Sequence, residues 1–301
     1  MLGVGRRVTC HVVRGTQQGG HGAWVSELVF VMREGGACLM DIRIGCSGFS
    51  YDDWVGPFYP LGAESRRFLE LYAERFDTVE INMTYYRIPA PRMVQGWVDR
   101  TPQGFLFTVK GNQLMTHDTE NPEAAAAIPR FREAIEPLVA ADRLGCVLLQ
   151  FPQRLRPTAE ARDHIAYLIS ELSPLPLVCE FRHESWSRET VHRWLGSRGV
   201  GYCCVDEPEL PGLMPRETVV TGGLGYLRFH GRNAAKWHEH EEASERYDYR
   251  YAREELEEWV PRVREMAGSA ERMLVYFNNH RMGQAPDNAE VFKELLRLVP
   301  E

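Results

Sequence analysis

Three features of the sequence predict a (β/α)8 barrel. Short apolar runs alternate with longer helical patterns from residue 41 onward, which is typical of βα units and a parallel sheet. Eight such runs occur, the number that closes a barrel of this class. Long loops follow several of the runs, whereas the loops that precede them are short, and in a barrel the loops after the strands build the functional face.

The predicted strands are short, and one of them indicates what lies inside the barrel. In residues 78–82, Val79 and Ile81 alternate with Thr78, Glu80 and Asn82, so one face of this strand is polar. Helices cover the outer face of a barrel strand, so a polar face fits a strand that lines the interior or a site. We expect strands at residues 42–46, 78–82, 105–110, 146–151, 177–181, 201–205, 226–230 and 273–278.

Helical patterns fill the segments between these strands. Thr158 precedes an apolar-periodic run and predicts a helix that begins with a capping side chain. After the sixth strand, Pro208, Pro211 and Pro215 leave no room for more than a helical turn, so the helix at this place is reduced. We expect helices at residues 63–76, 92–100, 122–140, 158–172, 188–198, 252–267 and 287–298.

Length and composition are those of a globular protein. The chain has 301 residues, of which 44% are hydrophobic and 26% charged, enough for one barrel-sized core. Its formal net charge of -7 disfavours nucleic acid as a partner, although a local basic patch is compatible with it. No apolar stretch reaches the roughly 18 residues that a membrane helix needs. We therefore expect no membrane association and a monomer.

The seven cysteines are odd in number, and most of them lie in apolar strand-like runs. No CxxC pair occurs, which argues against a zinc knuckle or a dithiol redox motif. The pattern indicates buried, reduced thiols and a cytoplasmic protein.

The first 39 residues differ in composition from the rest of the chain. They are rich in glycine and arginine, and Glu27 interrupts their one apolar segment. We interpret residues 1–39 as a disordered leader or the product of a misassigned start, with translation beginning at Met1, Met32 or Met40. Residues 40–301 are then a single barrel domain.

Polar residues end all eight predicted strands. In a parallel barrel these ends converge on one mouth, so the side chains there are candidates for binding a polar or anionic small molecule. The predicted substrate-binding residues are Ser47, Tyr51, Asn82, Tyr86, Lys110, His117, Gln150, Arg182, His183, Trp186, Arg228, Asn278 and Asn279.

Four further residues at the strand ends are candidates for proton transfer: Glu80, Glu180, Asp206 and His230. Two carboxylates in different environments can hold different protonation states and act as acid and base. Alternatively, Glu80 and Glu180 pair with arginines and tie the barrel together.

Lysine and metal chemistry also remain open at this mouth. Lys110 can form a Schiff base, hold an anionic group or pair with Glu80. His117, His183 and Asp206 could together hold a divalent metal, but no HExxH motif occurs, and we assign no residue as a metal ligand. The sequence requires no cofactor.

Segments along residues 41–299 resemble the uncharacterised YecE-like family, domain of unknown function seventy-two. The segments that carry the resemblance are Ile44-Gly45-Cys46-Ser47-Gly48-Phe49-Ser50-Tyr51, Phe76-Asp77-Thr78-Val79-Glu80-Ile81-Asn82, Leu149-Gln150-Phe151-Pro152, Glu180-Phe181-Arg182-His183, Arg228-Phe229-His230-Gly231-Arg232 and Tyr276-Phe277-Asn278-Asn279. The resemblance implies a TIM barrel and transfers no reaction. Cys46 stands where a threonine is frequent in the family.

Three functions fit these observations. The first is an enzyme with hydrolase-like acid/base chemistry on a polar or anionic small molecule or a nucleotide-like substrate. The second is a protein that binds a ligand or nucleic acid without catalysis, using its aromatic loops and arginines. The third is a metal-assisted phosphodiesterase similar to endonuclease-IV-like barrels.

Overall fold

The computed structural model describes residues 41–298, and Asp41–Glu301 form one compact unit. The predicted leader, with Cys10 and Cys38, lies outside the described residues. Within them, the cysteines are free and buried, as the apolar runs predicted: Cys46, Cys146, Cys179, Cys203 and Cys204. No helix in this described part is long and apolar enough to cross a bilayer.

Eight parallel strands form a barrel, which confirms the predicted fold class. Every sequential pair from β2 to β8 is hydrogen-bonded, and β8 pairs with β1. The strands are β1 (Ile42–Cys46), β2 (Thr78–Ile81), β3 (Leu106–Lys110), β4 (Leu144–Gln150), β5 (Leu177–Glu180), β6 (Gly201–Asp206), β7 (Leu224–Phe229) and β8 (Arg272–Phe277). Each lies within one or two residues of its predicted bounds.

The seam between β1 and β2 closes with few backbone bonds. At its carboxyl end, Ser47 and Glu80 form a bridge and the Gly48 amide donates to the Glu80 carbonyl at 2.8 Å. Lower down, the buried hydroxyl of Tyr72 accepts from the Cys46 amide at 2.7 Å and donates to the Thr78 carbonyl at 3.0 Å. A side chain thus replaces the missing ladder bonds.

Gly45 makes this close approach of the two strands feasible. A Cβ atom at this position would lie 2.2 Å from the Thr78 carbonyl oxygen and 2.8 Å from the Tyr72 hydroxyl. Any larger residue would push β1 away from β2 and open the seam.

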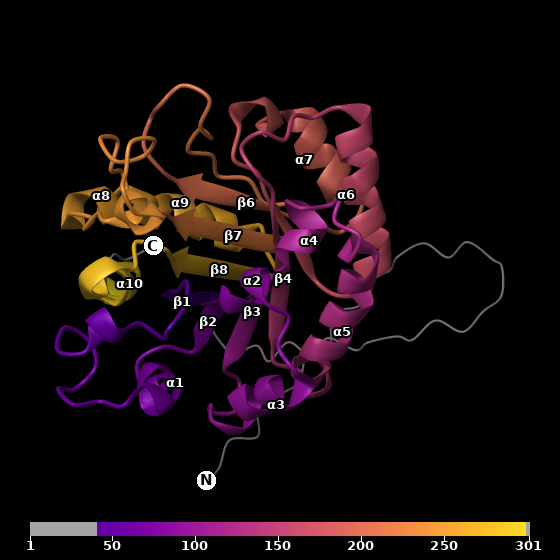
Figure 1. Cartoon of the computed structure of the whole chain (residues 1–301). Coiled ribbons are helices and arrows are strands. Elements are labelled where there is room, and N and C mark those ends of the chain that lie inside the picture. Colours follow the sequence, from indigo (N-terminus) through magenta and orange to yellow (C-terminus); the bar gives the residue numbers. More distant parts are fainter. Residues whose placement is uncertain (1–40, 299–301) are drawn as a thin grey trace, which may run out of the picture. The chain divides into compact units, whose positions relative to one another are not determined.

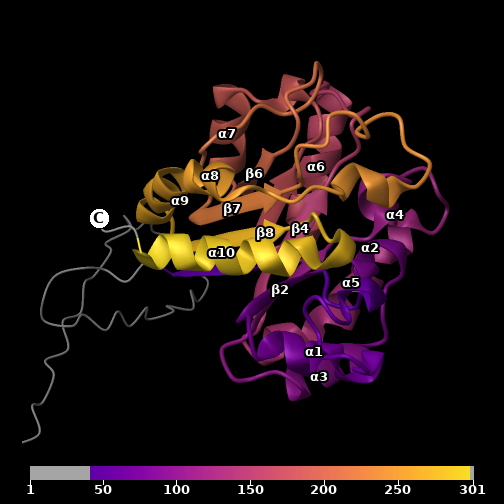
Figure 2. The same cartoon turned by 90° about the vertical axis from the view of Figure 1, so that its left-hand side faces the viewer.

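Helices surround the strands on the outside (Figures 1 and 2). The main ones are α1 (Phe68–Ala73), α3 (Pro91–Asp99), α5 (Ala124–Ala140), α6 (Ala159–Leu172), α7 (Glu189–Gly196), α8 (Arg253–Glu257), α9 (Trp259–Gly268) and α10 (Gln284–Leu298). The Thr158 hydroxyl accepts from the Ala161 amide at 3.2 Å, which confirms the predicted cap of α6. In Figure 2, α10 runs along β8, and it packs against β1 as well.

The helix after strand six was predicted to be reduced, and residues 207–223 of the described chain contain no helix at all. Two predicted helices differ in detail. The pattern at 252–267 forms two helices, α8 and α9, and the one at 63–76 begins with a 3-10 turn, Ser65–Arg67. Short helices α2 (Met83–Tyr86) and α4 (Gln113–Thr116) lie in loops at the carboxyl ends of β2 and β3.

A polar layer fills the middle of the barrel. The Tyr276 hydroxyl on β8 lies 2.6 Å from Thr78 Oγ1 and 3.0 Å from Thr108 Oγ1, so it reaches across to β2 and β3. The Tyr226 hydroxyl on β7 donates to Glu80 Oε2 at 2.6 Å. These buried hydroxyls are all hydrogen-bonded, and they form the floor beneath the charged mouth.

Candidate functional site

Arg228, on the inner face of β7, is the centre of the charged mouth. Its Nη2 donates to Glu80 Oε1 at 2.6 Å and to Ser47 Oγ at 3.3 Å, and its Nη1 donates to Glu180 Oε2 at 2.7 Å. Both carboxylates are fully buried and Arg228 is 1% exposed. Three strands are therefore joined by one guanidinium whose charge is compensated on both sides.

The electrostatics of this network favour the charged forms of Arg228 and Glu180. Burial opposes charge on Arg228, but Glu180 and Glu80 outweigh it and raise the pKa of the guanidinium well above its ordinary value. Burial likewise opposes charge on Glu180, yet Arg182, Arg228 and His230 hold the pKa of its carboxyl well below the usual range. A glutamate held ionised in this way is a poor proton donor near neutral pH.

The other oxygen of Glu180 faces His230 and Arg182. Glu180 Oε1 lies 3.3 Å from His230 Nε2 and 2.6 Å from Arg182 Nε, without completing a well-aligned hydrogen bond to either. Asn278 Nδ2 lies 3.1 Å from His230 Nδ1; with the amide donating, the imidazole proton is on Nε2 and points at Glu180. Burial, followed by repulsion from Arg182, lowers the pKa of His230 well below its ordinary value, so the ring is neutral.

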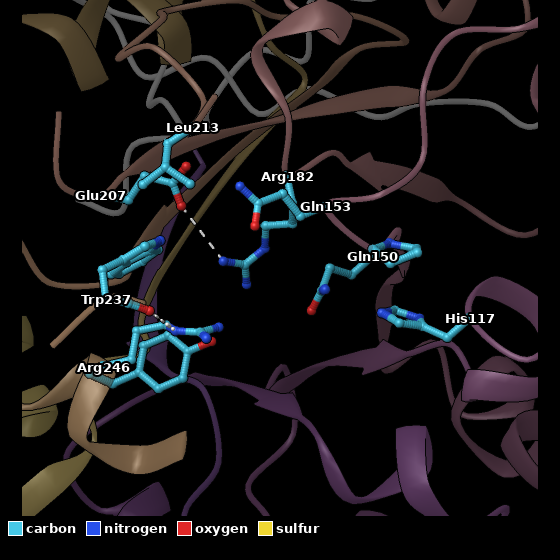
Figure 3. Close-up of a pocket in the computed structure, with 10 residues that line it drawn as sticks. His117, Gln150, Gln153, Arg182, Glu207, Leu213, Trp237 and Arg246 are labelled. Atoms are coloured by element: carbon cyan, nitrogen blue, oxygen red, sulfur yellow. Dashed lines mark hydrogen bonds and ion pairs between the residues drawn. The ribbon is translucent and has the colours of Figure 1, made fainter. Parts of the chain in front are cut away.

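A cavity of about 200 Å³ lies above this network at the carboxyl ends of the strands. Figure 3 shows the guanidinium of Arg182 at its centre, with Glu207 on one side and Gln150 and His117 on the other. The Arg182 side chain is 11% exposed, and its Nη1 lies 3.6 Å from Glu207 Oε2. The cavity is lined by His117, Gln150, Pro152, Gln153, Arg182, Glu207, Leu213, Trp237, Arg246 and Tyr247.

Glu207 is the carboxylate that the cavity offers for proton transfer. It is 1% exposed, and its Oε1 accepts from the Met214 amide at 2.9 Å. Its Oε2 has no hydrogen-bond partner in the part of the chain that the structure describes. Burial, only partly offset by Arg182, raises the pKa of this carboxyl to about 7. A group of this kind can both accept and donate a proton at neutral pH.

Lys110 is the last residue of β3. It does not form the ion pair with Glu80 that was one of the alternatives predicted for it, because Glu80 pairs with Arg228. Its Nζ lies 4.3 Å from the centre of the Tyr85 ring, and among the described residues it makes no ion pair or hydrogen bond. Burial and the charge of Arg228 lower the pKa of the ammonium to about 7. The His117 ring packs edge-to-face on Tyr85, so Lys110 lies beside the wall of the cavity.

Several predicted binding residues also lie around this mouth. His117 and Gln150 line the cavity, and burial and Lys110 lower the pKa of His117 to about 4. Tyr51 donates to the Ser47 carbonyl at 2.8 Å, next to Arg228. Asn82 has a buried Oδ1 atom without a hydrogen-bond partner.

Five predicted site residues lie away from the cavity, and the set of residues at the mouth is smaller than the sequence predicted. The first is Asp206, which faces the outer helices, where it accepts from Tyr251 at 2.7 Å, Trp259 Nε1 at 2.7 Å and Arg232 at 2.8 Å. Its oxygens are saturated with donors, so it stabilises the packing of the outer helices on the barrel.

The other four are held by local contacts. Asn279 bonds to Asn288 and to the Tyr249 carbonyl, and Trp186 stacks on Phe181 and donates to the Leu155 carbonyl at 3.0 Å. His183 bonds to Ser185, where it caps a 3-10 turn. Tyr86 is 73% exposed. None of them lines the cavity.

Sequence reasoning missed Glu207, Gln153 and Arg246, although a signal for Glu207 was available. Side chains alternate along a strand, and on β6 the inward positions include Cys203. Counting on in steps of two reaches Glu207, whereas Asp206 points outward. Arg246 and Gln153 come from long loops, for which no such alternation exists.

Among the described residues, no group of three or more His, Cys, Asp or Glu side chains has an arrangement that could hold a metal ion. His117, His183 and Asp206, considered together from the sequence, occupy three different places. Glu80 and Glu180 face guanidinium groups instead of an open coordination position. The residues therefore do not fit the metal-assisted alternative.

The chain is similar to a set of proteins that share this fold. A family model described as "Protein of unknown function DUF72" matches residues 43–301. UPF0759 protein YunF of Bacillus subtilis (strain 168) is 29% identical over 269 residues, covering 85% of this chain and 94% of YunF.

Two crystal structures are also similar to it. A DUF72 family protein from Thermotoga maritima MSB8 is 37% identical with a TM-score of 0.79, covering 85% of this chain and 99% of that one. A DUF72 family protein from Enterococcus faecalis V583 is 28% identical with a TM-score of 0.76, covering 86% and 97%. The resemblance drawn from the sequence segments is thereby confirmed.

Proposed function

The chain belongs to the DUF72 family, and from that premise we propose that it is a barrel enzyme that binds a small anionic substrate and catalyses its reaction by proton transfer. Arg182 binds the anionic group, and Glu207 accepts or donates the proton. Hydrolysis is the reaction that demands least of this site, because it needs one activated water and one proton donor.

The observation that carries the proposal is the pairing of Glu207 and Arg182 across one cavity. Glu207 Oε2, which has no hydrogen-bond partner among the described residues, and the Arg182 guanidinium 3.6 Å from it both belong to residues that line the cavity. At this distance the two groups do not hydrogen-bond to each other. A ligand between them could hydrogen-bond to both the Glu207 carboxyl and the Arg182 guanidinium.

The proposal revises which residues move protons. Glu80 and Glu180 share the guanidinium of Arg228 at the floor of the mouth, so they act as positioning residues. Glu180 also holds Arg182 from below, at 2.6 Å. His230 is fully buried and faces Glu180, which makes it a member of the same positioning network.

Two measurements test the proposal. Small molecules that copurify with the protein are identified by untargeted mass spectrometry, and we expect anions that are lost in Arg182→Gln but retained in Arg193→Gln, whose side chain is 71% exposed. Turnover of the identified anion should fall about 100-fold or more in Glu207→Gln, the range of one general acid/base group.

The matched control is Glu209→Gln, which removes a carboxylate that is 79% exposed two residues further along the chain. It should leave turnover unchanged. Binding of the anion without any turnover in the unmodified protein would favour the non-catalytic alternative, and full activity of Glu207→Gln would overturn the assignment.

A further inference from the structure

The chain contains only three lysines, at positions 110, 236 and 293, and 32 of its 35 basic residues are arginine (35 − 3 = 32). Lys236 lies 3.0 Å from Glu245, and Lys293 donates to the Arg75 carbonyl at 2.8 Å. Lys110 alone of these ends a barrel strand at the mouth. A site that needed only positive charge would be served by arginine, which offers more donors for an anion.

The surroundings of Lys110 suit an amine better than an ion pair. Among the described residues Nζ makes no ion pair, and the centre of the Tyr85 ring lies 4.3 Å from it. Burial, followed by the charge of Arg228, lowers the pKa of this ammonium to about 7, although Glu180 and Glu80 oppose the shift. Lys110 is partly exposed, and Tyr85 joins it to His117, which lines the cavity. An amine that loses its proton readily is nucleophilic near neutral pH.

From these observations we infer that Lys110 is a nucleophile that forms an imine with the carbonyl carbon of a small substrate that also carries a carboxylate or phosphate group. The inference rests on the proposed function, because Arg182 holds the anionic group of the same substrate. It names the substrate class: 2-oxo acids and phosphorylated aldehydes or ketones small enough for a cavity of about 200 Å³.

The chemistry balances without an added oxidant or reductant. The Nζ lone pair attacks the carbonyl carbon, and the carbonyl π electrons move to oxygen, which takes up a proton. The nitrogen gives up one proton as the oxygen gains one, which leaves a neutral carbinolamine. The hydroxyl then leaves as water with a proton supplied by Glu207, and the nitrogen lone pair forms the C=N bond. The resulting iminium can return its remaining proton to the Glu207 carboxylate. Hydrolysis returns the free amine by the reverse steps.

The test is reductive trapping of the full-length protein with pyruvate and sodium borohydride, followed by peptide mass spectrometry. We expect a carboxyethyl group on the peptide that contains Lys110, in at least tenfold excess over the peptides that contain Lys236 and Lys293. Lys110→Arg and Lys110→Met should lose the adduct, whereas Lys236→Arg and Lys293→Arg should retain it. Equal labelling of all three lysines, or none at Lys110, would overturn the inference.

A second measurement distinguishes failure of imine formation at Lys110 from failure of anion binding at Arg182. Calorimetric titration of pyruvate into Lys110→Met, with and without Arg182→Gln, measures anion binding without any imine chemistry, because both proteins lack the amine. Binding that depends on Arg182 without trapping removes the imine and leaves the proposed function intact. If acetaldehyde, which is neutral, is trapped at Lys110 while pyruvate binding does not depend on Arg182, Lys110 is a nucleophile and the proposed anion site at Arg182 is wrong.

Discussion

Arg228 is the residue on which the stability of the mouth depends most. Two fully buried carboxylates face it, and removing a buried partner leaves charge that neither water nor protein compensates. The cost of losing the guanidinium should therefore exceed that of losing any exposed arginine.

We predict that Arg228→Met lowers the free energy of unfolding by about 3–5 kcal/mol, the range for breaking a buried ion pair. Urea denaturation followed by circular dichroism measures it. Arg193→Met, which breaks an exposed pair with Glu189, should cost at most about 0.5 kcal/mol. Equal effects of the two substitutions would contradict the central role of Arg228.

The raised pKa of Glu207 predicts how the free energy of unfolding changes with pH. The pKa of its carboxyl is raised from 4.5 to about 7, so between these values the folded state binds a proton that the unfolded state has lost. Stability contributed by this group is present below pH 4.5 and is lost as the pH rises to about 7. Relative to Glu207→Gln, which does not titrate, the native protein should lose about 3 kcal/mol across this window.

Denaturation of both proteins at pH 5 and pH 8 checks this prediction. The comparison removes the contributions of other titrating groups, since these are common to both. A constant difference between the native protein and Glu207→Gln would mean that the buried carboxyl titrates as an exposed one does.

At the scale of single elements, the alternation of β6 decides which acidic residue serves the site. Asp206 and Glu207 are adjacent in the sequence, but successive side chains point to opposite faces, so one meets Trp259 outside and the other meets Arg182 inside. The sequence shows that two acidic residues are adjacent here. Which of them points into the barrel depends on which positions of β6 face inward.

The seam between β1 and β2 yields a prediction for an element pair. Tyr72→Phe removes the hydroxyl that joins the Cys46 amide to the Thr78 carbonyl and leaves both backbone groups buried and unpaired. We predict a loss of about 1–3 kcal/mol for each of these groups. Hydrogen exchange at the Cys46 amide should accelerate, as nuclear magnetic resonance or mass spectrometry can measure.

Tyr167→Phe is the matched control, because the Tyr167 side chain on α6 is 50% exposed. It should leave the melting temperature and the exchange of Cys46 unchanged. If Tyr72→Phe behaved in the same way, the seam would be closed by the bridge at Ser47 alone.

At the scale of the whole molecule, the barrel is complete within the residues that the structure describes. Every strand finds its partners between Ile42 and Phe277, and the family match begins at residue 43. We propose that residues 40–301 are the folding unit.

We predict that a protein consisting of residues 40–301 unfolds cooperatively, with the same midpoint in urea and the same slope as the full-length chain. Equal slopes would mean that equal surface is exposed on unfolding. A lower midpoint for the shorter protein would show that residues before 40 contribute to the barrel.

The sequence by itself determined the barrel, because the two periodicities of apolar residues distinguish strands from helices and eight strands in series close on themselves. It also determined that the strand ends are polar. Only the tertiary structure decided which of these polar groups meet. Arg228 pairs with both Glu80 and Glu180, the amine of Lys110 makes no ion pair within residues 41–298, and Glu207 faces the cavity in place of Asp206. Such pairings join residues up to 148 positions apart, and they depend on side-chain direction, burial and barrel closure, which local patterns do not encode.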